Sequence, residues 1–222
     1  MASTFSTKFF RSSSGFTLTE VLVTMVIAGI VTASIYGVQV ATMKTCSVQE
    51  QVVQMQQNLR AALEVMSDEI RMAGYVGDGG ATTAGISTSS SATQIIFTLD
   101  LDEDGDTADS GEYVDYALFT EGGVQKLGRN TTDPATGSPA DYDAVAEYIE
   151  GLDFAYTDDS GAAATGTSIT NVTITILGRT AKADPEYSTS ATFAKESGGS
   201  WGPYSDGYRR QVLATTIHCR NL

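Results

Sequence analysis

The feature that most constrains this chain is an apolar run near its amino terminus. Residues 16–36 contain a single acidic or basic side chain, Glu20. A helix of about 20 apolar residues spans the ~30 Å hydrocarbon core of a bilayer, so this run is just long enough to cross one. Residues 1–15 before it carry Lys8 and Arg11 and no acid. This asymmetry predicts that the amino terminus stays in the cytoplasm and that the rest of the chain lies outside.

The apolar pattern continues beyond residue 36 in another form. Apolar side chains recur at steps of three and four residues at Val48, Val52, Met55, Leu59, Leu63, Met66 and Ile70. This spacing predicts one apolar face of an amphipathic helix, and Gly74 is placed to end it. We expect one helix over residues 16–73 rather than two. Its weakest points are Gly29 and Gly37, because glycine costs about 1 kcal/mol inside a helix.

After residue 74 the chain becomes rich in Gly, Ser and Thr and then reads as strands separated by turns. Strands are predicted over residues 94–99, 113–119, 152–157, 169–177 and 209–219. A sheet with one apolar face needs a cover, and the amphipathic helix supplies one. We therefore predict an α+β fold in which one long N-terminal helix packs along an antiparallel sheet.

Composition and motifs exclude several functions. The formal charge is −14, and no basic stripe offsets it, so phosphate backbones should repel the chain and nucleic acid is not an expected partner. The one histidine, His218, falls in a predicted strand, where it is poorly placed as a catalytic base. No nucleophile elbow, phosphate loop or His/Cys metal cluster occurs. We do not expect an enzyme.

The segment "GFTLTEVLVTMVIAGIV" closely resembles the class III leader and first helix of type IV pilins and pseudopilins. In that family a prepilin peptidase cuts after the glycine and methylates the new amino terminus. The resemblance implies a leader over residues 1–15, cleavage between Gly15 and Phe16, and N-methylation of Phe16. It also implies a transmembrane and filament-core helix over 16–43, then a globular domain over 44–222 that includes the amphipathic helix 44–73. Glu20 becomes the fifth mature residue, where the family has its glutamate.

Three further segments, "QVVQMQQNLRAALEVMSDEIRMAGY", "DLDEDGD" and "RRQVLATTIHCRN", resemble PilW-type minor pilins, with the J-type pseudopilin of type II secretion as a cousin. The resemblance implies a minor pilin that primes assembly of a type IV pilus or joins its tip. The implied partners are the prepilin peptidase, other major and minor pilins, the inner membrane and the assembly platform. Two alternatives stay open: a pseudopilin of a type II secretion system, and a calcium-dependent adhesin at a filament tip.

Glu20 has a physical explanation within this resemblance. An ionised carboxylate near the bilayer interior costs about 2.5–3.5 kcal/mol, so it persists where it has a partner or a role. Cleavage after Gly15 would create a positive amine four residues away, and a neighbouring subunit's amine could pair with Glu20 in only one axial register. Low dielectric strengthens that pair. The blander alternative is that Glu20 pairs with its own amine or lies near the headgroups.

The segment "DLDEDGDTADSGE" is a candidate calcium site. Carboxylates alternate at Asp100, Asp102 and Asp104, followed by Gly105 and Asp106, which is the spacing of EF-type loops. In an EF-type loop that begins at Asp100, the twelfth residue should be a bidentate glutamate. Here the twelfth residue is Gly111, and Glu112 follows one residue later. The segment lies between strands rather than helices, and the alternative is a solvated acidic turn. Ten acids and no base occur between Met72 and Gln125, which favours a cation.

The chain has two cysteines, Cys46 and Cys219. Both would lie outside the cytoplasm in the predicted topology, where a disulfide could form and persist. Such a bond would tie the last strand to the long helix, provided that the two Cα atoms come within about 7 Å. The alternative is two buried free thiols.

Overall fold

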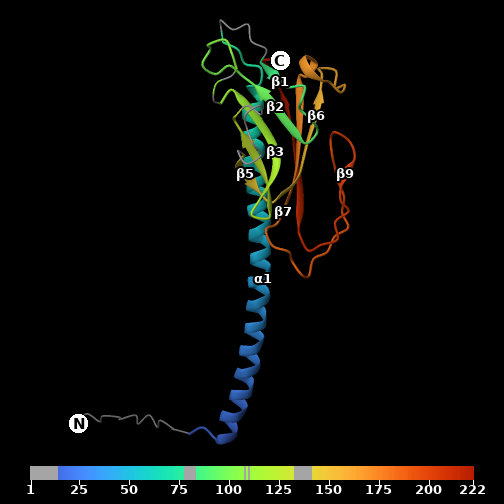
Figure 1. The fold of residues 1–222 in the computed structure, drawn as a ribbon. Helices are drawn as coiled ribbons and strands as arrows, with labels where there is room; N and C mark the ends of the chain where they lie inside the picture. Colours follow the sequence, from blue (N-terminus) through green and yellow to red (C-terminus); the bar gives the residue numbers. More distant parts are fainter. Residues whose placement is uncertain (1–14, 78–83, 108, 110, 133–141) are drawn as a thin grey trace, which may run out of the picture. The chain divides into compact units, whose positions relative to one another are not determined.

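The computed structural model describes residues 15–77, 84–107, 109, 111–132 and 142–222. It divides the chain into two compact units, residues 1–47 and 48–222. A helix of 54 residues, α1 (Leu18–Arg71), belongs to both units and continues through Gly29 and Gly37 (Figure 1). The prediction of one helix is therefore confirmed, and each end lies two residues inside the predicted bounds.

The part of α1 in the first unit exposes its apolar side chains: Leu22 is 56% exposed, Met25 69% and Ile30 63%. Its hydroxyl groups, in contrast, are satisfied by the helix itself. Thr32, Ser34 and other hydroxyl side chains donate to the carbonyl oxygens one turn earlier, at 2.7 and 2.8 Å in these two cases. Such bonds let polar side chains enter an apolar medium. Within the described chain, α1 alone has the length and composition to cross a membrane.

The second unit contains two antiparallel sheets and a short hairpin, instead of the single sheet that was predicted. The first sheet runs in chain order through β1 (Gly85–Ile86), β2 (Gln94–Thr98), β3 (Tyr113–Glu121), β4 (Val124–Asn130) and β5 (Asp143–Glu147). The second has the order β10-β7-β6, formed by β10 (Arg210–His218), β7 (Asn171–Arg179) and β6 (Ile149–Thr157). The hairpin pairs β8 (Phe193–Ala194) with β9 (Ser200–Trp201), and a 3-10 turn, η2 (Gly166–Ser168), precedes β7.

All five predicted strands are present, with ends shifted by up to three residues. The sequence analysis missed β4 and β5, because neither shows a clear apolar alternation. In β5 only Ala146 is fully buried, and β4 carries Lys126 and Arg129 among its few apolar residues. These two strands extend the first sheet, which has five strands and is separate from the three-stranded second sheet.

The core lies between α1 and the two sheets. The predicted stripe is confirmed from Met55 onward: Met55, Leu59, Leu63, Met66 and Ile70 are buried, and they join one cluster with residues of β2, β3, β4, β6 and β7. Its first two members, Val48 and Val52, are only half-buried. The approach is closest at Gly178 of β7, where a Cβ atom would lie 2.8 Å from the Leu59 side chain. A polar link accompanies this packing, because Glu69 of α1 accepts bonds from Tyr116 (2.7 Å) and Arg129 (2.9 Å).

A buried arginine ties the long segment between β7 and β10 to the second sheet. The Arg210 side chain is 1% exposed and forms ion pairs with Glu150 (2.5 Å) and Asp206 (2.6 Å). Its guanidinium group also lies 3.7 Å from the centre of the Tyr204 ring. Breaking a buried pair by removing one partner typically costs several kcal/mol, so this cluster holds the segment in one place.

Gly74 ends the helical segment at a point where only glycine fits. Its φ angle is +79°, and its amide donates to the Thr98 carbonyl oxygen at 3.0 Å, which joins the end of α1 to β2. A Cβ atom at this position would lie 2.6 Å from the backbone oxygen of Asn221. The turn thus needs glycine for two separate reasons, the left-handed backbone and the close approach of the C-terminal residues.

We predict that Gly74→Ala lowers the free energy of unfolding by about 2–4 kcal/mol, because a left-handed backbone costs a non-glycine residue about 1–2 kcal/mol and the steric contact adds to that. Thermal unfolding of the full chain in detergent measures the loss. Gly122→Ala is the matched control: Gly122 has a φ of +60° but no atom lies within 4 Å of its would-be Cβ, so it should lose only the backbone term. Equal losses in the two variants would contradict the role given to Asn221.

Candidate functional site at the start of the helix and in the acidic loop

The predicted cleavage site lies directly before α1. Gly15, Phe16 and Thr17 are non-helical and exposed, and Phe16 is 83% exposed. No atom lies within 4 Å of the position that a Cβ on Gly15 would take. The Gly15–Phe16 bond is therefore in an open, irregular stretch directly before the helix. Residues 1–14 of the predicted leader lie outside the described residues.

Glu20 takes part in the N-terminal cap of α1. Its Oε2 atom accepts hydrogen bonds from the Thr17 amide at 3.1 Å and from the Thr17 hydroxyl at 3.0 Å, and the Glu20 amide donates back to the Thr17 hydroxyl oxygen at 3.3 Å. This reciprocal arrangement is a capping box. It supplies partners for amides that the first turn of a helix otherwise leaves without one.

The capping box was missed by the sequence analysis, although a Thr-x-x-Glu pattern before an apolar run is its known signature. It adds a further role for Glu20, a cap on its own helix through Thr17, to the pairing with an amine and the place near the headgroups. Both cap bonds end on Oε2. Among the described residues, Oε1 of Glu20 takes no part in the cap, so the carboxylate can bind a cation from outside the helix without giving up its bonds to Thr17.

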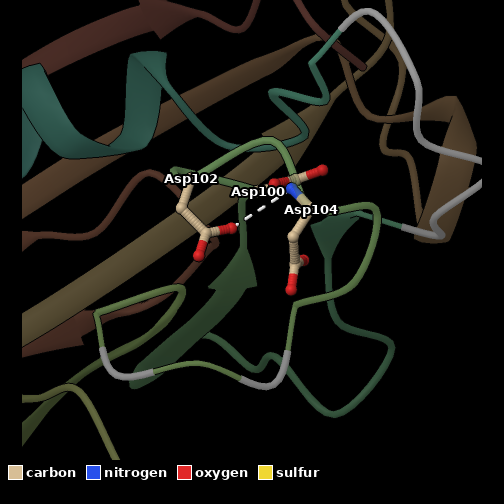
Figure 2. A group of neighbouring side chains, drawn as sticks. All are labelled: Asp100, Asp102 and Asp104. Carbon is tan, nitrogen blue, oxygen red and sulfur yellow. Dashed lines mark hydrogen bonds between the residues drawn. The ribbon is translucent and has the colours of Figure 1, made fainter.

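The acidic loop between β2 and β3 brings together three of the predicted calcium ligands. Asp100, Asp102 and Asp104 each offer a carboxylate oxygen, and these oxygens lie within 4.8 Å of one another (Figure 2). The Asp104 amide donates to Oδ1 of Asp102 at 3.2 Å, the bond drawn as a dashed line. Asp106 groups with Asp104 and Asp109 instead.

Glu112, the fifth predicted ligand, belongs to neither carboxylate group in the described chain. It is buried, and its two oxygens accept backbone amides of the loop: Oε1 from Leu101 at 2.8 Å and Oε2 from Asp109 at 3.2 Å. The Glu112 side chain therefore stabilises the loop backbone through these two hydrogen bonds. Repulsion from Asp102 and Asp104 raises the pKa of Asp109, which indicates how much negative charge the loop concentrates.

Asp100 stands apart from the other loop carboxylates because it is completely buried. Its Oδ2 atom accepts the Gly105 amide at 3.2 Å, whereas Oδ1 has no hydrogen-bond partner among the described residues. A buried polar atom without a partner costs about 1–3 kcal/mol, and more when it is charged. A cation bound to Oδ1 of Asp100 would offset this cost.

The two cysteines are free thiols. Cys219 is buried, and its Sγ lies 3.7 Å from the Ile70 carbonyl oxygen near the end of α1. Cys46 is exposed and lies more than six turns earlier in the same helix, at ~3.6 residues per turn. The candidate disulfide is not formed in this structure, and of the two thiols only Cys219 is buried. Burial raises the pKa of the Cys219 thiol to about 11, so it stays protonated at neutral pH.

Comparison with known protein families decides what this chain is. Residues 48–194, about two thirds of the chain, match the family model of prepilin peptidase-dependent protein B. Residues 10–36 match the prokaryotic N-terminal methylation motif, which includes Gly15, Phe16 and Glu20. The chain belongs to the prepilin peptidase-dependent protein B family. The resemblance to the type IV pilin superfamily, first drawn from residues 15–31, is thereby confirmed.

Among solved structures, the prepilin peptidase-dependent chain is similar to the type IV-like pilin TTHA1219 from Thermus thermophilus. The two are 14% identical, the match covers 76% of this chain and 98% of the other, and the TM-score is 0.48. No curated protein sequence matches the chain.

The family assignment confirms three broader expectations. The fold is α+β as predicted, with a long N-terminal helix packed on antiparallel sheet. The family is structural and is not known for enzymes. The apolar start of α1 together with the methylation motif is consistent with anchoring in the inner membrane.

Proposed function

We propose that this protein is a minor pilin of a type IV pilus, which primes assembly or forms part of the tip complex after cleavage and N-methylation at Phe16. The observation that carries the proposal is the position of Glu20: it lies in the first turn of an exposed apolar helix, five residues after Gly15, inside the matched methylation motif. The prepilin peptidase and other pilins are the proposed partners, with the assembly platform of the inner membrane.

In this proposal the uncleaved chain is held in the inner membrane by the first part of α1, with its amino terminus in the cytoplasm and the second unit in the periplasm. Cleavage of the Gly15–Phe16 bond frees the Phe16 amine. As subunits enter the filament, the apolar face of each helix leaves lipid for the helices of its neighbours. The exposed Met25 and Ile30 are examples of side chains that such packing would bury.

The charge of Glu20 then selects the axial register. An ion pair at 4 Å is worth about 1 kcal/mol in water and about 4 kcal/mol at an effective dielectric constant near 20. The second value is comparable to the ~2.5–3.5 kcal/mol cost of placing the carboxylate in the membrane. A neighbour's amine at Oε1 would offset this cost in one register only. The cap on Oε2 would meanwhile keep the side chain oriented.

We predict that Glu20→Gln is cleaved normally but enters filaments at least tenfold less than the parent. Glutamine can replace glutamate in a capping box, so this variant removes the charge and keeps the cap, whereas Glu20→Ala removes both. Immunoblots of sheared filaments and of membranes measure incorporation. Glu50→Gln, an exposed position further along α1, is the matched control. Normal incorporation of Glu20→Gln combined with failure of Glu20→Ala would reduce Glu20 to a capping residue.

We predict that Gly15→Val stays at the mass of the precursor. The motif implies a peptidase that requires a small residue before the cleaved bond, so a branched side chain at this position should prevent cleavage. Intact-mass spectrometry of membrane extracts separates the precursor from the chain that begins with methylated Phe16. Gly29→Ala, a glycine with equally open surroundings but far from the cleavage site, should be processed normally. A mature Gly15→Val chain beginning at Phe16 would contradict the assigned bond.

A deletion strain separates the pilus from the secretion system. Loss of surface pili with normal secretion is the expected result for a minor pilin, and complementation with the parent gene should restore the pili. Normal pili with secreted proteins retained in the periplasm would assign the chain to a type II pseudopilus instead. The calcium-dependent adhesin considered from the sequence stays a prediction.

A further inference from the structure

We propose that the loop between β2 and β3 binds one calcium ion, with Asp100, Asp102 and Asp104 as its carboxylate ligands. The proposal does not depend on the role of the protein in a filament. It rests on two separate observations, the spacing of the three carboxylates and the buried oxygen of Asp100 that has no partner among the described residues.

The spacing fits a single ion. Calcium binds oxygen ligands at about 2.3–2.6 Å, so two oxygens on the same ion lie at most about 5 Å apart. One carboxylate oxygen from each of Asp100, Asp102 and Asp104 lies within 4.8 Å of the other two. Three carboxylates this close repel one another strongly unless a cation lies between them. These distances are compatible with one ion in contact with all three side chains.

The loop is already folded around this position. Oδ1 of Asp102 accepts the Asp104 amide, and Oδ1 of Asp104 accepts the Asp106 amide at 3.0 Å. Gly105, with a φ of +93°, makes the sharp turn that alternating ligands require. Beneath the loop, Glu112 holds the backbone through its bonds to Leu101 and Asp109. The shape of the loop is thus fixed by hydrogen bonds that leave the cluster negatively charged.

Asp100 supplies the second observation. Its side chain is fully buried, and Oδ2 is held by the Gly105 amide while Oδ1 has no partner among the residues described. Buried carboxylates of folded proteins are ordinarily paired, hydrogen-bonded or bound to a metal. The buried orphan oxygen belongs to the residue that also completes the group with Asp102 and Asp104. A bound cation accounts for both facts at once.

The donor set favours calcium over other metals. All three side chains are carboxylates, and His218, Cys46 and Cys219 lie in other parts of the chain. Hard oxygen donors select calcium or magnesium rather than zinc or copper. Asp102 and Asp104 are exposed on an irregular loop, so backbone oxygens and water can complete the six to eight ligands that calcium takes. A site of this kind has a dissociation constant of about 0.1–1 mM, as in extracellular modules.

Binding should stabilise the end of α1 as well as the loop. The Asp100 amide donates to the Tyr75 carbonyl oxygen at 2.8 Å, and the Tyr75 hydroxyl donates to Glu103 at 2.8 Å. Tyr75 follows α1 by four residues, so the loop is bonded directly to the turn in which the helix ends. An ion held by Asp100 therefore fixes a contact between helix and sheet.

The test is thermal unfolding of the full chain in detergent, in chelator and across a calcium chloride titration. The melting temperature of the parent should rise by about 3–6 °C at 5 mM calcium, with half of that rise reached at about 1 mM. The variant D102N/D104N should show no rise. Its asparagine oxygens can still accept the two loop amides, and both positions are exposed, so the variant should melt in chelator at or above the temperature of the parent.

Asp159→Asn is the matched control, because it removes an exposed acid from a different turn and should keep the full calcium response. Identical melting of the parent in calcium and in chelator would overturn the proposal. An equal rise in D102N/D104N, or an equal rise with 5 mM magnesium chloride, would overturn it too, since ionic screening would then explain the effect. Calorimetric titration of the parent should give a stoichiometry of one calcium per chain that the double variant lacks.

Discussion

Burial of the apolar stripe of α1 against two sheets is the interaction on which the rest of the second unit depends. Fully burying one large aliphatic side chain stabilises a protein by about 1.5–3 kcal/mol. Leu59, Met66 and Ile70 are all fully buried, and Met55 and Leu63 nearly so. Together they contribute on the order of 10 kcal/mol, which is as large as the net stability of an ordinary domain. Without this helix the two sheets would each expose an apolar face.

The first part of α1 has a different distribution of apolar side chains from the part that covers the sheets. There the apolar side chains are exposed and the hydroxyl groups of Thr32 and Ser34 are satisfied by the helix's own carbonyl oxygens. This is the pattern of a segment whose surroundings are lipid or other apolar helices. One continuous element thus has a stripe in one part and an apolar surface all round in the other. The change in pattern marks where the environment of the helix changes.

The sequence was sufficient for the features that depend on local patterns of apolar residues. The stripe of α1 could be predicted because its buried residues recur at steps of three and four. The strands β2, β3, β6, β7 and β10 could be predicted because each is a short run rich in β-branched and other apolar residues, bounded by turn residues. Other features depend on contacts distant in sequence. In the Arg210 cluster, Arg210 forms ion pairs with Asp206 and with Glu150, and Glu150 is distant in the sequence. β5 is an edge strand with little apolar content. The capping box at Thr17 and Glu20 depends on residues close in sequence and could have been predicted from the Thr-x-x-Glu pattern. The apolar run that follows was interpreted instead as a membrane-spanning segment.

Glu20 and Asp100 illustrate one principle in two settings. Each is a carboxylate in a place that disfavours negative charge: Glu20 heads an apolar helix, and Asp100 is buried beside other acids. In both, one oxygen is held by the chain's own amide groups, Oε2 of Glu20 by Thr17 and Oδ2 of Asp100 by Gly105. The other oxygen takes part in no such bond with the described chain. A carboxylate with one oxygen held by the chain and the other available is preorganised to bind a cation. Because an unpaired charge in such a place costs free energy, a cation that reaches the available oxygen is favoured over one placed elsewhere.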